Sequence, residues 1–326
     1  MSESTLTVDV FLTAAQLRAA LEDDVSRGLR AVPKSIPPLW FYDENGSRLF
    51  EEITRLPEYY PTRVERAMLE RYAPEIAALA GADTLVELGA GACDKTRLLL
   101  DAMRAVGPLE SYVPFDVSDE FLRQAAAGLI DDYDGLSVHA VIGDFRQHLG
   151  RIPATGRRLV AFLGGTIGNL VPAERQRFFF DLNCTMGGGD HLLLGADLVK
   201  DRRRLVAAYD DAQGVTAAFN KNVLRVINAE LGADFDPEAF DHVALWNEDE
   251  RWIEMRLRSE SRQRVQVADL GLDVTFDAGE DLLTEISAKF DPAGLERELF
   301  DADFILDEMW GADEGDFVLA LAHPYC

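Results

Sequence analysis

One acid and two glycines in the stretch LVELGAGACDKTRLLLDAM, residues 85–103, are of types and spacing that suggest chemistry. A short apolar run carries Glu87, turns through Gly89 and Gly91, and enters an amphipathic helical pattern. This strand, turn and helix sequence is typical of nucleotide binding. The third glycine of the dinucleotide fingerprint GxGxxG is missing, so a purely structural turn remains an alternative.

Two further acids end the next two predicted strands. Asp116 closes SYVPFDV, where an acid takes ribose hydroxyls, and Asp144 with Phe145 closes VHAVIGDF. An acid followed by an aromatic ring suits the exocyclic amine and the ring face of an adenine. Glu87 is placed to receive the cationic amine of a ligand. For each acid taken alone, capping of a helix is the alternative.

The elements around these acids alternate between strand and helix from residue 84 to residue 199. Continuous apolar strands separated by helical stretches predict a parallel sheet that is covered on both faces. Because the carboxyl ends of parallel strands meet at one edge, Glu87, Asp116 and Asp144 are expected along one ligand crevice. The sequence therefore predicts a Rossmann-like α/β domain. Its pattern of acids resembles that of class I S-adenosylmethionine-dependent methyltransferases rather than that of NAD enzymes.

A second region with another pattern follows residue 200. Helical stretches at 201–213 and 215–231 lead into segments of period-two alternation over 243–290, which predict an antiparallel sheet with one buried face. We interpret it as an insertion, after which residues 294–323 complete the first sheet. Near the N-terminus, two capping boxes predict helices, from Thr13 and Gln16 and from Thr62 and Glu65. An aromatic-rich connection separates them.

The composition of the 326 residues excludes several classes of function. A net charge of -26 opposes binding to nucleic acid. The three cysteines form no CxxC pair and the five histidines no HExxH motif, so we expect no metal site and no disulfide framework. No apolar run approaches the roughly 20 residues of a membrane span, and the N-terminal stretch carries acids where a signal peptide carries bases. We expect a cytoplasmic protein without membrane contact.

Six blocks spread in order along the chain resemble the L-histidine Nα-methyltransferases of ergothioneine biosynthesis. These blocks are PPLWFYD, ITRLPEYYPTR, VELGAGACDKTRLLL, FLGGTIGNL, YDDAQGVTAAFNKN and LLTEISAKF. The resemblance implies a class I methyltransferase domain over 64–199 plus 290–326 and a smaller α+β substrate-binding domain over 11–63 plus 200–289. It implies S-adenosyl-L-methionine as cofactor, S-adenosyl-L-homocysteine as its product, and trimethylation of L-histidine to hercynine by a monomer.

The resemblance also implies site residues. The family's cofactor positions match Gly89, Lys95, Asp116, Asp144 and Phe145 here, to which the pattern of acids adds Glu87. Its substrate positions match Tyr42, Tyr59, Asn169, Tyr209, Met255, Glu285 and Ser287, with Tyr42 and Asn169 expected to take part in catalysis. The family's small residue after the second glycine is Ala92, beside Cys93, to which we give no role.

Three of these positions have alternatives. Glu285 and Ser287 share one face of a strand, and burial of Glu285 needs a partner, either an imidazole N–H or a nearby arginine such as Arg256. Asn169 sits in a GN pair, which is common in turns. Met255 alternates with apolar neighbours, so core packing explains it equally well.

Rival functions differ in substrate or in class. A related enzyme acting on another small amine and a cofactor-binding protein without catalysis both fit the motifs. A nucleic-acid methyltransferase is disfavoured by the charge and by the absence of an NPPY-type motif.

Overall fold

The chain divides into two compact units in the computed structural model, which describes residues 5–91, 95–107 and 109–325. Unit 1 comprises residues 1–12, 61–199 and 290–326, and unit 2 comprises residues 13–60 and 200–289. The sequence placed the first boundaries near residues 11 and 64, within three residues of these divisions. Each unit contains segments that are distant in sequence, so neither is a contiguous piece of chain.

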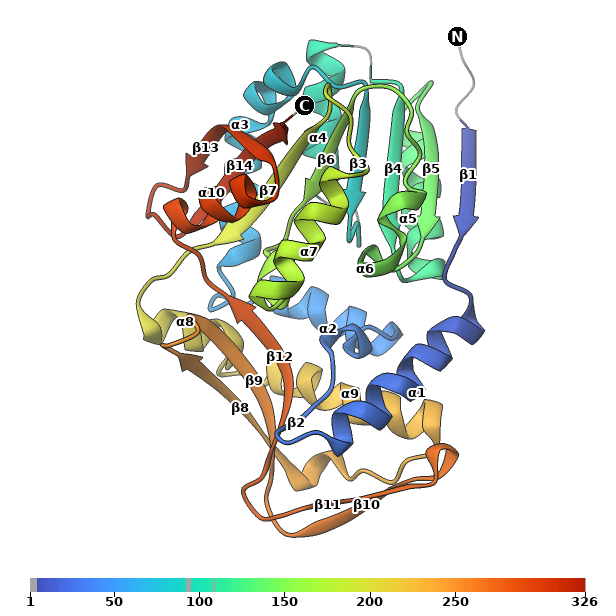
Figure 1. The fold of residues 1–326 in the computed structure, drawn as a ribbon, viewed down its shortest axis with the longest axis vertical. Helices are drawn as coiled ribbons and strands as arrows, with labels where there is room; N and C mark the ends of the chain where they lie inside the picture. The colour runs from blue at the N-terminus through green and yellow to red at the C-terminus, as the bar shows by residue number, and fades with distance from the viewer. Residues whose placement is uncertain (1–4, 92–94, 108, 326) are drawn as a thin grey trace. The chain divides into compact units, whose positions relative to one another are not determined.

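Unit 1 is built on an eight-stranded sheet in the order β1-β5-β4-β3-β6-β7-β14-β13 (Figure 1). Strands β1 to β7 of this sheet pair in parallel, whereas β14 is antiparallel to β7 and to β13. The strands are β1 (Thr5–Val10), β3 (Thr84–Leu88), β4 (Ser111–Asp116), β5 (Ser137–Ile142), β6 (Arg158–Phe162), β7 (His191–Asp197), β13 (Phe304–Gly311) and β14 (Phe317–Pro324).

Helices surround this sheet because its central strands bury both faces. All residues of β3 and β6 are buried, and Leu99 and Met103 of α4 share a core with Leu85 and Tyr112. The described helices of unit 1 are α3 (Pro61–Ala80), α4 (Thr96–Val106), α5 (Asp119–Asp132), α6 (Phe145–His148), η2 (Leu149–Arg151), η3 (Thr166–Asn169), α7 (Pro172–Asn183) and α10 (Pro292–Asp301). The predicted parallel sheet is confirmed.

Strand β1 was not predicted. It lies at one edge of the sheet and pairs in parallel with β5, from Thr5 opposite Ser137 to Val10 opposite Ile142. Its residues are exposed or half-buried, and the hydroxyls of Thr5 and Ser137 lie 2.8 Å apart. A strand that buries so little apolar surface has no continuous apolar run to reveal it.

Unit 2 contains a four-stranded sheet in the order β2-β12-β9-β8, in which β12, β9 and β8 are antiparallel, and a separate β10–β11 pair. These strands are β2 (Lys34–Ser35), β8 (Phe240–Asn247), β9 (Trp252–Ser259), β10 (Gln263–Val267), β11 (Leu272–Phe276) and β12 (Asp281–Ala288). The helices are α1 (Ala14–Arg30), η1 (Pro38–Phe41), α2 (Glu44–Thr54), α8 (Arg202–Tyr209), α9 (Val215–Leu231), η4 (Pro237–Ala239) and η5 (Ala268–Leu270). The antiparallel insertion predicted from period-two alternation is confirmed.

The two predicted capping boxes have different outcomes. Thr13 caps α1 as predicted: the Gln16 N–H donates to the Thr13 hydroxyl oxygen, and the Thr13 N–H donates to Gln16 Oε1. The box at Thr62 and Glu65 is wrong, because α3 begins at Pro61 and Glu65 is buried with other partners. The aromatic connection was read as a linker but contains η1 and α2.

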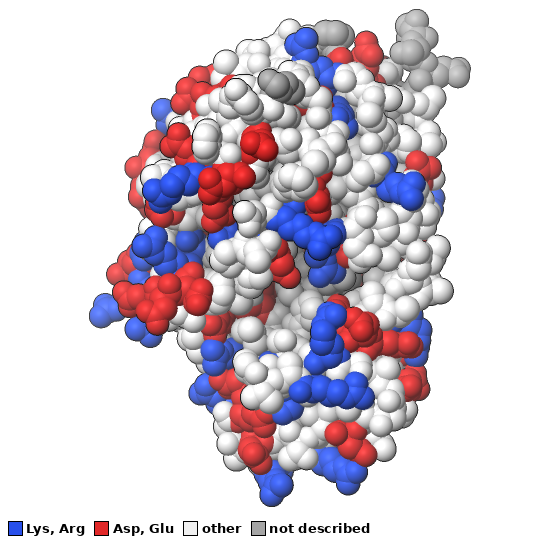
Figure 2. All heavy atoms as spheres, in the orientation of Figure 1, with Lys and Arg blue, Asp and Glu red and all other residues white. Residues whose placement is uncertain are grey.

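Charged side chains of both signs are interspersed over the face shown in Figure 2. Many form ion pairs one helical turn apart, such as Arg27 with Asp23. In the part of the chain that the structure describes, no helix is long and apolar enough to cross a membrane. Ala92 and Cys93 lie outside the described residues.

Candidate active site

The glycine loop of unit 1 leaves open space above its backbone. Gly89 and Gly91 have φ angles of 71° and 51°, in the left-handed region that favours glycine. A Cβ atom placed on either residue would meet no atom of the described residues within 4 Å. The loop therefore offers a cradle in which a ligand can approach the main chain closely, as the S-adenosylmethionine assignment requires.

Asp116 is fixed beside this loop at the end of β4. Its Oδ2 accepts a hydrogen bond from the Gly91 N–H at 3.1 Å, and its Oδ1 accepts one from the Ser118 N–H at 3.0 Å. Burial raises the pKa of Asp116, while these backbone hydrogen bonds oppose the rise. A carboxylate held at a strand end next to the second glycine suits a ribose diol.

Glu87 has hydrogen-bond partners within the protein, whereas the sequence suggested the amine of a ligand. Its Oε2 accepts hydrogen bonds from the Thr96 hydroxyl and, at 2.8 Å, from the Tyr112 hydroxyl. Burial raises the pKa of Glu87 to about 6, although these hydroxyls and the charge of Lys95 oppose the rise. The carboxylate thus ties β3 to β4 and to the first residue of α4. Its contact with a ligand amine stays a prediction.

Lys95 forms an ion pair with Glu65, which is fully buried on α3. The Gly164 N–H also donates to Glu65 Oε1, at 2.7 Å. A Cβ atom at Gly195 on β7 would lie 2.1 Å from the same oxygen, so only glycine leaves room for this carboxylate. The Lys95 side chain keeps 22% of its surface exposed whereas Glu65 has none. Glu65 therefore anchors Lys95 from within the fold.

Asp144 acts as the N-cap of α6, as the capping alternative anticipated. Its Oδ1 accepts from the Arg146 N–H at 2.9 Å, and the Arg146 guanidinium donates to Oδ2 at 2.8 Å. The half-buried ring of Phe145 packs edge-on against Phe162 and Phe178, at centroid distances of 5.3 and 5.7 Å. Both residues follow β5, at the same edge as Asp116.

Asn169 ends η3, which follows β6 through two left-handed glycines, Gly164 and Gly165. Its side chain is half-buried. Among the described residues, none forms a hydrogen bond with its amide group. The carboxyl ends of β6, β3, β4 and β5 are adjacent, so unit 1 brings Asn169, Lys95, Asp116 and Asp144 to one edge of its sheet.

In unit 2, Tyr209, Ser287 and Lys289 form a buried polar cluster. The Tyr209 and Ser287 hydroxyl oxygens lie 2.7 Å apart, and the Lys289 ammonium donates to them at 2.9 and 2.8 Å respectively. All three residues are buried, and Lys289 Nζ lies 4.8 Å from the Tyr209 ring centroid. His242 Nε2 lies 2.8 Å from the Tyr209 carbonyl oxygen and supports its backbone.

Glu285 is the acid of unit 2 that faces this cluster along β12. It is half-buried, and no hydrogen bond or ion pair reaches its carboxyl group from the described chain. Burial raises the pKa of Glu285 to about 8, against the opposing charge of Lys289. The alternative partner, Arg256, pairs instead with Glu254 and with Asp281.

The register of β12 against β9 places Met255 opposite Glu285 and Ile253 opposite Ser287. The register shifts between Leu283 and Glu285, where the Thr284 hydroxyl donates to the Met255 carbonyl at 2.9 Å. Met255 is 2% exposed, so it packs in the core and also borders Glu285. Core packing of Met255 is therefore observed, and its contact with a substrate stays a prediction.

Tyr42 and Tyr59 join an aromatic cluster in unit 2. The ring of Tyr42 contacts Phe50 and Phe219, and Tyr59 contacts Phe50 and Tyr209, all at centroid distances of 5.5–6.2 Å. Tyr42 is 37% exposed, whereas Tyr59 is buried. The cluster brings Tyr59 into contact with Tyr209 and connects Tyr42 to Tyr59 through Phe50.

Sequence reasoning did not find Glu65, Lys289, Phe50 and Phe219. Lys289 stands two residues after Ser287, and this strand spacing was a usable signal, because Glu285, Ser287 and Lys289 share one side of the chain. Glu65 had no such signal, because its partners, Lys95 and Gly164, come from distant segments.

Comparison with known proteins places the chain in a family. The family described as histidine-specific methyltransferase, SAM-dependent, matches residues 21–324. Histidine N-alpha-methyltransferase of Mycolicibacterium smegmatis is 56% identical over 318 residues, which cover 98% of this chain and 99% of the relative. The protein of that name from Mycobacterium tuberculosis is 55% identical over 303 residues, or 93% of this chain and 94% of the relative.

A more distant relative is Ergothioneine biosynthesis protein 1 of Neurospora crassa, 32% identical over 205 residues, or 61% of this chain and 23% of that protein. The family match covers the strands that carry the glycine loop and the strand that carries Glu285. This chain therefore belongs to the histidine-specific, S-adenosylmethionine-dependent methyltransferases.

Proposed function

We propose that this chain transfers methyl groups from S-adenosylmethionine to the α-amine of L-histidine, three times, to give hercynine for ergothioneine biosynthesis. The observation that carries the substrate is Glu285, whose half-buried carboxyl group has no hydrogen-bond or ion-pair partner among the described residues and lies two positions before Ser287 on β12. A buried acid without a partner is costly, and an imidazole ring supplies one. The identity of the relatives supports the same assignment.

The expected cofactor residues of unit 1 would hold and orient S-adenosylmethionine. Asp116 would bind the ribose hydroxyls, Phe145 and Asp144 the adenine, and Gly89 and Gly91 would admit the ligand to the main chain. Lys95, anchored by Glu65, would meet the cofactor's carboxylate. Bound S-adenosylmethionine would supply a methyl group carried on a sulfonium. The amine nitrogen would bond to this carbon as the sulfur–carbon bond breaks, and S-adenosylhomocysteine would be the leaving group.

The histidine side chain would bind at Glu285 and Ser287. Neutral imidazole has one N–H donor and one acceptor nitrogen, so its two nitrogens need an acceptor and a donor. Glu285 would accept from the N–H when ionised. Because the site's own polar groups would be left unpaired, an apolar analogue would be rejected by a factor of about 10⁴–10⁵.

The Tyr209–Ser287–Lys289 cluster is rich in hydrogen-bond donors. One hydroxyl donates to the other across their 2.7 Å contact, and Lys289 donates to both oxygens. Such a cluster would suit an acceptor atom of the substrate, either the imidazole nitrogen or a carboxylate oxygen. Asn169 would supply a further amide donor for the carboxylate.

The α-amine must lose its ammonium proton before each transfer, either to water or through a tyrosine hydroxyl such as that of Tyr42 or Tyr59. Alignment of its lone pair with the methyl carbon contributes about 7–11 kcal/mol of barrier reduction. As methylation proceeds the amine becomes a bulky cation, which an aromatic ring stabilises by about 0.5–2 kcal/mol. The aromatic rings of Tyr42 and Tyr59 would stabilise the methylated cation in this way.

Incubation with histidine and S-adenosylmethionine, followed by mass analysis, tests the proposal. We expect mono-, di- and trimethylhistidine with the first two transient, and we expect Glu285→Ala to weaken activity on histidine selectively. Glu250→Ala, at an exposed acid of the β8–β9 turn, is the matched control. Methylation of another amino acid in place of histidine contradicts the substrate, and cofactor binding without any product contradicts catalysis.

The setting of the enzyme is also a proposal. The acidic composition and the cysteines without CxxC spacing support a cytoplasmic enzyme, and we propose that it acts as a monomer. Light scattering coupled to size exclusion tests the monomer, because a mass near twice 36.2 kDa contradicts it.

A further inference from the structure

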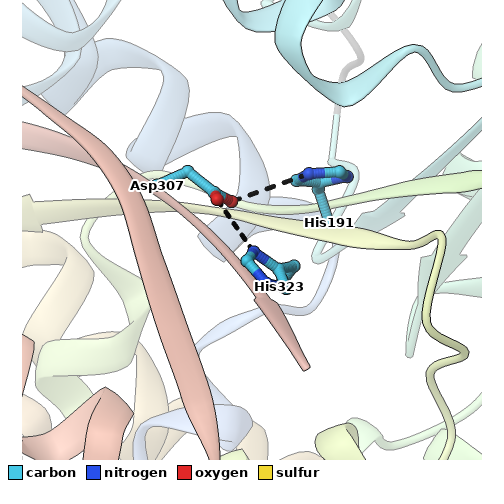
Figure 3. A group of neighbouring side chains, drawn as sticks. All are labelled: His191, Asp307 and His323. Carbon is cyan, nitrogen blue, oxygen red and sulfur yellow. Dashed lines mark hydrogen bonds and ion pairs between the residues drawn. The ribbon is translucent and has the colours of Figure 1, made fainter. Parts of the chain in front are cut away.

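A group of metal-ligating side chains lies in unit 1 on three adjacent strands. His191 begins β7, Asp307 lies on β13 and His323 lies on β14 (Figure 3). His323 Nδ1 is 2.8 Å from Asp307 Oδ1, and His191 Nε2 is 3.6 Å from Asp307 Oδ2. One ligand atom from each residue lies within 4.8 Å of the others.

The strand pairing explains this convergence. Ala322 of β14 is opposite Leu192 of β7, and continuing this antiparallel register places His323 beside His191. Between β13 and β14 the register shifts from Leu306 to Glu308, so Asp307 is the extra residue of a β-bulge. A bulge redirects a side chain that regular pairing would place elsewhere, and bulges are enriched next to functional sites.

His191 lacks the partners that a buried imidazole normally has. Its Nδ1 is buried and has no hydrogen-bond partner among the described residues, and the 3.6 Å distance from Nε2 to Asp307 is too long for a hydrogen bond. Nε2 is thus left without a hydrogen bond on the side that faces Asp307, and an imidazole nitrogen in this position can ligate an ion.

We propose that His191, Asp307 and His323 bind one divalent transition-metal ion of the zinc class. Two imidazoles and a carboxylate are a preferred donor set for such ions, with a fourth position left for water. In a tetrahedral zinc site, ligand atoms about 2.0–2.2 Å from the ion lie about 3.3–3.6 Å apart. The three ligand atoms, now within 4.8 Å of one another, would reach this spacing through side-chain rotations that move them by about 1 Å.

The site lies at the amino end of β7, whereas Asp116 and Asn169 lie at the carboxyl ends of the parallel strands. The ion would therefore take no part in methyl transfer. It would join the edge strand β13 to β14 and β7, cross-linking three strands that the hydrogen-bond ladders already align.

Titration of the tag-free full chain, first treated with a chelator, with Zn²⁺ or Co²⁺ tests the site. We expect one ion bound per chain, a higher unfolding midpoint with Zn²⁺, and a Co²⁺ absorption spectrum without thiolate charge transfer. His323→Ala and Asp307→Asn should each weaken binding about 10-fold or more and abolish the shift in midpoint.

His139→Ala is the matched control, because His139 Nε2 lies 2.8 Å from Asp9 Oδ2 in a similar histidine–aspartate pair on β5 and β1. This variant should bind the metal as the unaltered chain does. Binding that both site variants retain, binding through thiolate, or no saturable binding would each overturn the proposal.

Discussion

The ammonium nitrogen of Lys289 lies 2.9 Å from the phenol oxygen of Tyr209, in a region of unit 2 where both side chains are shielded from solvent. Burying a cation is costly unless it is hydrogen-bonded, and two hydroxyls meet it here. The cation holds the tyrosine oxygen in place and opposes the rise in the pKa of Glu285. Lys289 is therefore a positioning residue for the proposed histidine site.

Lys289→Met should reduce kcat/KM for histidine while KM for S-adenosylmethionine stays within about twofold. Hydrogen bonds to charged groups contribute about 1.5–3 kcal/mol, so the loss corresponds to roughly 10–100-fold. Steady-state kinetics with each substrate varied in turn measures it.

Lys200→Met is the control for this substitution. Lys200 also donates to a tyrosine hydroxyl, that of Tyr60 at 2.7 Å, and lies 4.4 Å from its ring centroid. Equal losses in the two variants would show that the effect of Lys289 is not specific to the proposed site.

Glu285→Gln should make stability less dependent on pH. Between the usual pKa of 4.5 and about 8, the folded chain keeps the Glu285 proton that the unfolded chain loses. Stability from this group is full below pH 4.5 and falls as pH rises toward 8, by at most about 1.4 kcal/mol per pH unit. Urea unfolding of both proteins at several pH values measures the difference. If both curves keep the same slope, Glu285 does not have a raised pKa.

The ion pair of Lys95 and Glu65 predicts an asymmetry. Lys95→Met leaves a fully buried carboxylate without its cation and should cost about 3–5 kcal/mol of stability. Glu65→Gln should cost less, because Lys95 keeps contact with solvent, and the double variant should recover part of the loss. Glu65→Gln should also raise KM for S-adenosylmethionine more than KM for histidine.

Glu70→Gln is the control on the same helix, since Glu70 pairs with Arg66 one turn away and their side chains are 53% and 50% exposed. It should change stability by less than about 0.5 kcal/mol. A Lys95→Met effect as small as this would mean that the buried pair contributes nothing.

Tyr42→Phe should change the balance of mono-, di- and trimethylated products, because it removes a hydroxyl from the amine's path and keeps the ring. Mass spectrometry of timed samples measures the balance. An unaltered profile and rate would remove Tyr42 from the mechanism, and Tyr325→Phe, at an exposed tyrosine of unit 1, should leave both unchanged.

Much of the fold was visible in the sequence because its signals are local. The apolar runs of β3, β6 and β7 and the alternation of β9 and β12 follow from burial on two faces or on one. Strand β1 was not predicted because most of its residues are exposed. Helix α2 was not predicted because its aromatic residues were interpreted as part of a connection.

The candidate site was less predictable wherever a residue's role depends on distant partners. Glu65 lies three residues after Thr62, which is the spacing of a capping box. Only the folded structure shows that its carboxylate is enclosed by Gly164 and Gly195. Asp307 has no distinguishing neighbours in sequence, and a bulge brings it to two histidines. Asp144, by contrast, fulfils the local role that its position before a helix indicated.

The place of β14 in the sheet has a consequence for biosynthesis of the chain. This strand lies between β7 and β13 but is translated last, after the whole of residues 200–289. Until it emerges from the ribosome, β7 presents a bare row of amide and carbonyl groups, a template for unwanted pairing between nascent chains. The second unit thus has time to acquire its own structure while the first still waits for its last strand.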